Sequence, residues 1–264
     1  FSTVVFSQNY NYAIEEPQKQ TLPVLPVVNN LQEEIDYFKA YFLPLSQRAN
    51  LQSALNTYGA VRLEAGNYRV GGLARITLNS NMRLYGHSSY NEMPEINIAA
   101  GATNVLVTSV KAWYGINFLS GSPITNCTIS HVSGGYISAT NALIENCKFI
   151  DIIGSTLNIN NTSSGYFKNN KFIKHWVTSA YPQLSLKGNT TTPSTGNTWT
   201  WLNLLTAHGD ATDIDTFGNL NIVGLDAEAW NYNNLGTGKA LLHMRNMGDV
   251  KLASMAGLGY AANP

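Results

Sequence analysis

The sequence is poor in charge. Only 12% of its 264 residues are charged, and 16 basic residues balance 16 acidic ones. Nucleic acids and anionic membrane surfaces are bound through a surplus of Lys and Arg. We therefore expect neither as a partner.

Long hydrophobic runs and cysteines are also scarce. The apolar segments are interrupted by Asn, Gly or Thr, whereas a bilayer-spanning helix needs about 20 apolar residues, so no membrane insertion is expected. Cys127 and Cys147 are too few for a disulfide scaffold and lack the second pair of a zinc site. They are predicted to be small buried side chains, and no metal or cofactor is expected.

The first residues show no regular pattern. The sequence opens at Phe1 with neither an initiator Met nor a signal-peptide pattern, so we expect a processed or shortened chain. Pro23 and Pro26 disfavour a central strand or a helix. Residues 1–30 are therefore predicted to be an extended lead-in or linker.

Helical patterning follows in residues 31–58. After Asn30, a suitable N-cap, apolar residues recur at helical spacing: Leu31, Ile35, Phe38 and Phe42. Pro44 ends this predicted helix, and a second one, residues 51–58, ends at Gly59 as a C-cap. We interpret residues 31–58 as N-terminal capping helices.

From Ala60 the periodicity changes to two, and an internal repeat appears. The pattern apolar-x-Asn-(Cys/Asn)-x-apolar occurs at 124–129, 144–149 and 167–172, with steps of 20 and 23 residues. Such repeats bury their apolar faces only by stacking. Residues 59–264 are therefore predicted to form an all-β, single-stranded parallel β-helix. Two stacks are expected, one of turn amides and one beside it: Asn126, Asn146 and Asn169, then Cys127, Cys147 and Asn170.

A family resemblance lies in residues 51–86. A capping helix is followed by V-x-L-x-A-G-x-Y-x-V and then by I-x-L-x-S-N-x-x-L-x-G. This stretch resembles the opening of pectate-lyase-like right-handed β-helix domains, especially those of bacteriophage tailspikes. The resemblance implies a homotrimer in the virion tail, contacts with other tail proteins, and a capsular or O-antigen polysaccharide as partner. No capping element follows Leu258, so we also expect a missing C-terminal portion.

A polar column is predicted two residues after the equivalent positions Ile129, Phe149 and Phe172. It contains His131, Asp151 and Lys174. A sugar-binding groove needs such a mixed column, although alternating charge also suits a solvated surface. An insertion at 188–196 makes the register of the next coils uncertain, but His208 and then Asp226 or Glu228 fall near the column.

Acidic residues are concentrated between 210 and 228, where five of the sixteen acids fall. Paired carboxylates carry out glycoside hydrolysis, and basic residues with a cation carry out lyase elimination. The candidate catalytic residues are His208, Asp210, Asp213, Asp226 and Glu228, and Asp213 shares one strand face with Asp215. An acidic turn or a calcium-supporting surface is the alternative.

Aromatic residues of the second half are candidates for glycan contacts, because sugar rings pack on aromatic faces. They are Trp176, Tyr181, Trp199, Trp201 and Trp230. Core or subunit-interface packing is the alternative for each. Residues 181–201 are predicted to form a protruding loop.

Three functions compete. The first is a tailspike-type protein that binds and depolymerises a bacterial surface polysaccharide. The second is a non-catalytic receptor-binding or structural fibre segment of the same fold. The third is a polysaccharide lyase, which is disfavoured because the basic residues are scattered.

Overall fold

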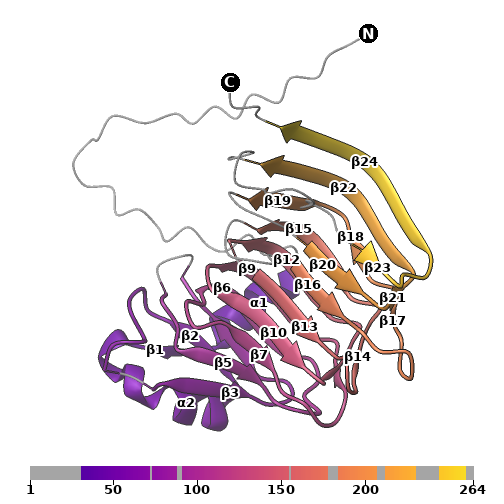
Figure 1. The fold of residues 1–264 in the computed structure, drawn as a ribbon. Helices are drawn as coiled ribbons and strands as arrows, with labels where there is room; N and C mark the ends of the chain where they lie inside the picture. The colour runs from indigo at the N-terminus through magenta and orange to yellow at the C-terminus, as the bar shows by residue number, and fades with distance from the viewer. Residues whose placement is uncertain are drawn as a thin grey trace, which may run out of the picture.

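The computed structural model describes residues 31–71, 73–87, 91–154, 156–177, 184–206, 212–229 and 244–259. In these ranges the strands stack as a parallel β-solenoid of about seven turns, rising from the helices to β24 (Figure 1). The predicted parallel β-helix is therefore confirmed. Residues 1–30 lie outside the described ranges.

Four parallel sheets form the sides of the solenoid. Sheet A has eleven strands: β1 (Tyr41–Leu43), β2 (Ala60–Leu63), β4 (Arg83–Tyr85), β6 (Leu106–Lys111), β9 (Thr128–Ser133), β12 (Lys148–Ile153), β15 (Lys171–Val177), β18 (Thr198–Trp199), β19 (Leu202–Thr206), β22 (Leu220–Ala229) and β24 (Val250–Gly259). Sheet B has eight: β3 (Arg75–Leu78), β5 (Glu95–Ile98), β7 (Ile116–Phe118), β10 (Tyr136–Thr140), β13 (Thr156–Asn160), β16 (Leu184–Lys187), β20 (Thr212–Asp215) and β23 (Met244–Arg245). The two smaller sheets are β8 (Ile124–Thr125), β11 (Leu143–Glu145) and β14 (Tyr166–Lys168), and β17 (Ser194–Thr195) with β21 (Phe217–Gly218).

The core is a set of stacked columns, one inward residue from each coil. In sheet A the rings of Phe149 and Phe172 stack at 4.4 Å, and Trp199 continues the stack at 4.4 Å from Phe172. Trp199 is fully buried. It is therefore a core residue, and its predicted role in glycan contact is corrected, because its ring has no access to a surface ligand.

The helical segment differs from its prediction in one place. Helix α1 (Leu31–Lys39) ends before Phe42, because residues 41–43 form β1 and pair with β2 to open sheet A. A 3-10 helix (Leu45–Asn50) then leads into α2 (Leu51–Tyr58). Buried leucines of α2 close this end of the core, whereas α1 packs on the outside of sheet A.

The predicted amide stack is confirmed and is longer than expected. Asn126, Asn146 and Asn169 occupy equivalent turn positions, since each N–H donates to the carbonyl of the residue that precedes the equivalent position in the next coil. Asn81 and Asn104 extend this Asn column towards the N-terminus, and their side-chain amides hydrogen-bond at 3.2 Å.

The neighbouring inward stack is confirmed as well. Cys127 and Cys147 are free thiols and fully buried, as predicted. Asn170 continues the stack, and its Oδ1 accepts the N–H of Cys147 at 2.9 Å. Its Nδ2 donates to Oδ1 of Asn197 in the next coil at 3.1 Å, so this buried polar step is paired.

The predicted protruding loop at 181–201 is wrong for its described part. Residues 184–187 and 198–199 form strands that pair with both neighbouring coils, and residues 194–195 form a strand that pairs with the following coil. This stretch is a regular coil of the solenoid. Tyr181 lies outside the described residues.

Candidate functional site

A bend in each long strand of sheet A brings the predicted polar column to the surface. His131, Asp151 and Lys174 have φ of 52°, 53° and 58°. In a regular strand, a residue two positions after an inward one also points inward. Here both Ile129 and Val132 are buried, so the bend places two residues, not one, between inward positions.

The strand register stacks these bends directly. Ile150 pairs with Ser130 and Ile152 with Val132, which sets Asp151 beside His131, and the same pairing sets Lys174 beside Asp151. We call this set the bend column; its members are Ser109, His131, Asp151, Lys174, Trp201, Gly224 and Ser254. The predicted stacking of three of them is confirmed, and their role stays a prediction.

A second column runs beside the first, two residues further along each coil. We call it the outer column; its members are Asn67, Glu92, Lys111, Ser133, Ile153, Trp176, Asn203 and Asp226. Adjacent coils of such a stack lie about 4.8 Å apart. The two columns, with Trp113 and Tyr114 after β6, are referred to below as the wall.

The centre of the wall combines aromatic rings with charge. Trp176 and Trp201 are 42% and 49% exposed, as a ligand-contacting role requires. Lys174 Nζ lies 3.0 Å from Oδ1 of Asp151 on the adjacent coil. Gly224 allows the Trp201 ring to lie over the next coil, because a Cβ there would come within 3.0 Å of the ring.

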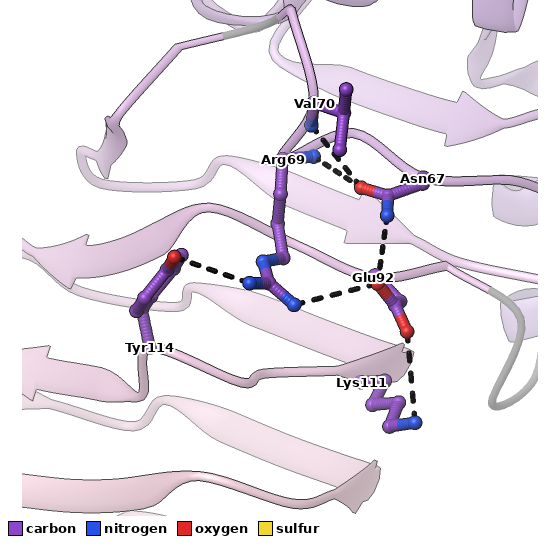
Figure 2. Close-up of polar contacts among 6 residues, drawn as sticks. All are labelled: Asn67, Arg69, Val70, Glu92, Lys111 and Tyr114. Atoms are coloured by element: carbon purple, nitrogen blue, oxygen red, sulfur yellow. Dashed lines mark hydrogen bonds and ion pairs between the residues drawn. The ribbon is translucent and has the colours of Figure 1, made fainter.

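The N-terminal end of the wall is a polar cluster (Figure 2). Glu92 accepts a hydrogen bond from the Asn67 amide at 2.8 Å and lies 3.4 Å from Arg69 and 3.7 Å from Lys111. Arg69 Nη2 also donates to the Tyr114 hydroxyl at 3.1 Å. One carboxylate therefore faces two cations.

Local backbone geometry fixes the cluster. Oδ1 of Asn67 accepts the N–H groups of Arg69 at 2.9 Å and Val70 at 3.2 Å, an Asx turn that sets where Arg69 leaves the backbone. The cations lie over rings, with Lys111 4.2 Å from the Trp113 centroid and Arg69 4.6 Å from that of Tyr114.

Sequence reasoning missed the charged members of this cluster. The steps from Asn67 to Glu92, to Lys111 and to Ser133 are 25, 19 and 22 residues. Because the turns differ in length, no fixed sequence period reveals the outer column. The adjacent aromatic pair Trp113-Tyr114 was the visible signal.

The acidic candidates do not come together as one site. Asp213 and Asp215 share a face of β20, as predicted, but β20 belongs to sheet B. Asp226 and Glu228 belong to β22 of sheet A. A single acid pair joining Asp213 to Asp226 is therefore not supported, because the two strands form different sides of the solenoid.

The acids of β20 lie beside cations and hydrogen-bond donors. Asp213 lies 3.1 Å from Lys187 and 2.8 Å from Arg245. Hydrogen bonds from Asn246 and Thr216 and the charges of Arg245 and Lys187 lower the pKa of Asp215. A general acid must hold a proton at working pH, so Asp215 is unsuited to that role.

Some candidates and site types remain outside this geometry. His208, Asp210 and Trp230 lie outside the described residues. In the ranges that are described, no group of three or more His, Cys, Asp or Glu side chains could hold a metal ion. None of the described helices is long and apolar enough to cross a bilayer.

No family model, no curated protein and no solved structure matches this chain. The fold itself is consistent with a β-helix family. The likeness of residues 51–86 to tailspike and pectate-lyase openings stays a prediction.

Proposed function

We propose that this protein is a tailspike-type recognition protein that binds a bacterial surface polysaccharide along the wall. The observation that carries the proposal is the pair of exposed rings, Trp176 and Trp201, beside a stacked row of charged side chains. Sugar rings present apolar faces that pack on aromatic rings, while their hydroxyls bond to nearby charged and amide groups.

The repetition of the wall favours a polymer as ligand. Successive coils add members at about 4.8 Å spacing, and the outer column has eight stacked members. A row of evenly spaced contacts suits an extended chain. Because most members of the columns lie on paired strands of sheet A, their contacts are held in place before the ligand arrives.

The assembly belongs to the proposal and rests on the resemblance of residues 51–86. A tailspike-type protein would be a homotrimer attached to other tail proteins, with the wall facing the host surface. Sedimentation of the purified protein measures this separately from binding, and a monomer would contradict the trimer.

Alanine variants of the two rings test the binding proposal. Trp176→Ala and Trp201→Ala are each expected to weaken retention of capsular or O-antigen polysaccharides roughly tenfold or more, as truncation of a central Trp does at interfaces. Tyr136→Ala is the matched control, since Tyr136 is 37% exposed but lies on β10 of sheet B. Equal retention by all three variants would contradict the proposal.

Depolymerisation is the second candidate function. One observation favours it: the register of β22 places Asp226 in the outer column, paired with Asn203, which in turn pairs with Trp176. Glu228 follows two residues later on the same strand, and two carboxylates are the apparatus of glycosidic cleavage.

Product analysis separates binding from cleavage. Asp226→Asn and Glu228→Gln are expected to abolish chain shortening while retention persists, with Asp213→Asn on sheet B as control. New reducing ends indicate a hydrolase, and an unsaturated, ultraviolet-absorbing product indicates a lyase. If the unaltered protein retains the polysaccharide without shortening it, the remaining function is non-catalytic receptor binding.

A further inference from the structure

The cluster at the N-terminal end of the wall has more positive than negative charge. Arg69 and Lys111 share the single carboxylate of Glu92, and all three side chains are half-buried. On sheet B, by contrast, Arg75 has a carboxylate of its own in Glu95. The cluster thus carries one positive charge in excess.

The cations of this cluster also have hydrogen-bond donors that the cluster itself does not use. A guanidinium has five N–H donors, and Arg69 gives one to Glu92 and one to Tyr114. Its Nε is shielded from solvent, so the donors left for a ligand are the second N–H of Nη1 and the second N–H of Nη2. Lys111 lies 3.7 Å from Glu92, beyond ordinary hydrogen-bond length. Both cations therefore retain donors for an arriving anion.

Two aromatic faces flank these donors. Trp113 and Tyr114 are 46% and 50% exposed although each lies under a cation. A ring-shaped ligand that stacks on them would bring its substituents to the cations. A carboxylate is the substituent that a guanidinium binds best, through two parallel hydrogen bonds.

We propose that Arg69, Lys111, Trp113 and Tyr114 form a subsite for a carboxylate-bearing sugar, so that the polysaccharide is an acidic one. Glu92 keeps the two cations in position in the free protein and competes with the carboxylate of the ligand. This inference rests on the proposed function, because it takes the ligand to be a glycan.

The position of the subsite fits a polymer that also reaches the tryptophans. Lys111 and Trp176 are both in the outer column, separated by Ser133 and Ile153. Three coil steps correspond to about 14 Å. One glycan chain of a few sugars would therefore contact both places.

The experiment compares each polysaccharide of a bacterial panel with its own carboxyl-reduced form, in which the acid has become an alcohol. Binding is measured by calorimetry at low and high salt. The variants are Arg69→Gln, Lys111→Gln and Glu92→Gln. The matched control is Arg75→Gln, which removes an exposed Arg from sheet B.

Binding is expected to be confined to acidic polysaccharides and to be lost on carboxyl reduction. Arg69→Gln and Lys111→Gln should each weaken it roughly ten- to hundredfold, as removal of a hydrogen bond to a charged group does. Glu92→Gln should tighten it roughly two- to fivefold, because an exposed competing ion pair is removed. Arg75→Gln should leave it unchanged, and added salt should weaken it.

Two results would overturn the subsite while leaving the proposed function intact. One is retention that survives carboxyl reduction, and the other is equal binding by Lys111→Gln and Arg75→Gln. If no polysaccharide of the panel is retained, the proposed function fails and the subsite with it. Lys111→Gln keeps the test decisive if Arg69→Gln fails to fold, since Lys111 makes no contact that fixes a turn.

Discussion

The Asn column and the bend column share a left-handed backbone at most of their positions but carry different residues. Asn81, Asn104, Asn126, Asn146 and Asn169 have φ between 53° and 64°, and the bend column members Ser109, His131, Asp151 and Lys174 have φ between 52° and 58°. Asn tolerates this left-handed region best among residues with a side chain. At these four positions the bend column instead has Ser, His, Asp and Lys, of which Lys is poorly suited.

The difference indicates what each column is for. An unfavourable residue in the left-handed region costs of order 1–3 kcal/mol. At the turns the chain uses the residue that relieves this cost. Along the wall it tolerates the cost at Lys174, whose ammonium pairs with Asp151. The Asn column is thus explained by the backbone alone, whereas the bend column is explained by what its side chains contact.

The largest expected effect comes from a substitution in the Asn column. Asn146→Val places a β-branched side chain at a φ of 57°, which should lower the free energy of unfolding by about 2–3 kcal/mol. Urea denaturation measures it, with the exposed Asn158→Val on β13 as control. A loss no greater than that of the control would remove the backbone explanation of the Asn column.

A second test places Asn, the residue type of the Asn column, at a position of the bend column. Lys174→Asn should leave the free energy of unfolding unchanged or raise it by about 1 kcal/mol, because relief of left-handed strain outweighs an exposed ion pair. The same variant should bind the wall's glycan more weakly. Urea denaturation and calorimetry are compared on one preparation. A clear loss of stability would show that Lys174 is held for folding and not for binding.

A smaller effect is expected at a glycine of the bend column. Gly224 has a φ of 83°, and a Cβ there would lie 3.0 Å from both the Trp201 ring and the Thr200 carbonyl. Gly224→Ala should therefore cost about 1 kcal/mol and displace the Trp201 ring. Thermal unfolding and glycan retention measure the two effects. Weakened retention is expected even where the protein remains folded.

The smallest effect concerns left-handed residues outside both columns. Thr216 and Asn246 have φ of 57° and 49°, and both hydrogen-bond to Asp215. Because the folded pKa of Asp215 is lowered, its contribution to stability is present above the ordinary Asp pKa and is lost as pH falls through the folded value. The contribution should be under about 1 kcal/mol.

Thermal unfolding from neutral to strongly acidic pH measures that contribution. Asp215→Asn should show a shallower decline than the unaltered protein. Parallel curves would mean that the carboxylate of Asp215 contributes nothing that depends on its charge.

The solenoid and part of the wall could be predicted because strand residues repeat at nearly constant spacing. Asn126, Asn146 and Asn169 gave the register, and counting two residues beyond the inward positions then led to His131, Asp151 and Lys174. The bend that turns these side chains outward could not be predicted. It depends on a left-handed φ, and the residue types His, Asp and Lys do not indicate that conformation in a sequence.

The missed features share a different cause. Coil turns vary in length without disturbing the strands, so Glu92 and Lys111 fall into the outer column at spacings that no fixed period detects. Trp199 was misassigned for the same reason, since the uncertain register beyond Gly188 concealed its equivalence to Phe172. The start of sheet A at β1 depends on pairing with β2, a contact that helical spacing alone cannot reveal.

The buried stack of Phe149, Phe172 and Trp199 also has a spectroscopic consequence. Trp199 is sealed in the core, whereas Trp113, Trp176 and Trp201 face solvent. A soluble quencher should therefore reach the wall's indoles and spare that of Trp199. A glycan that covers the wall would protect the quenched emission and leave the core emission as an internal reference, so binding can be followed without any label.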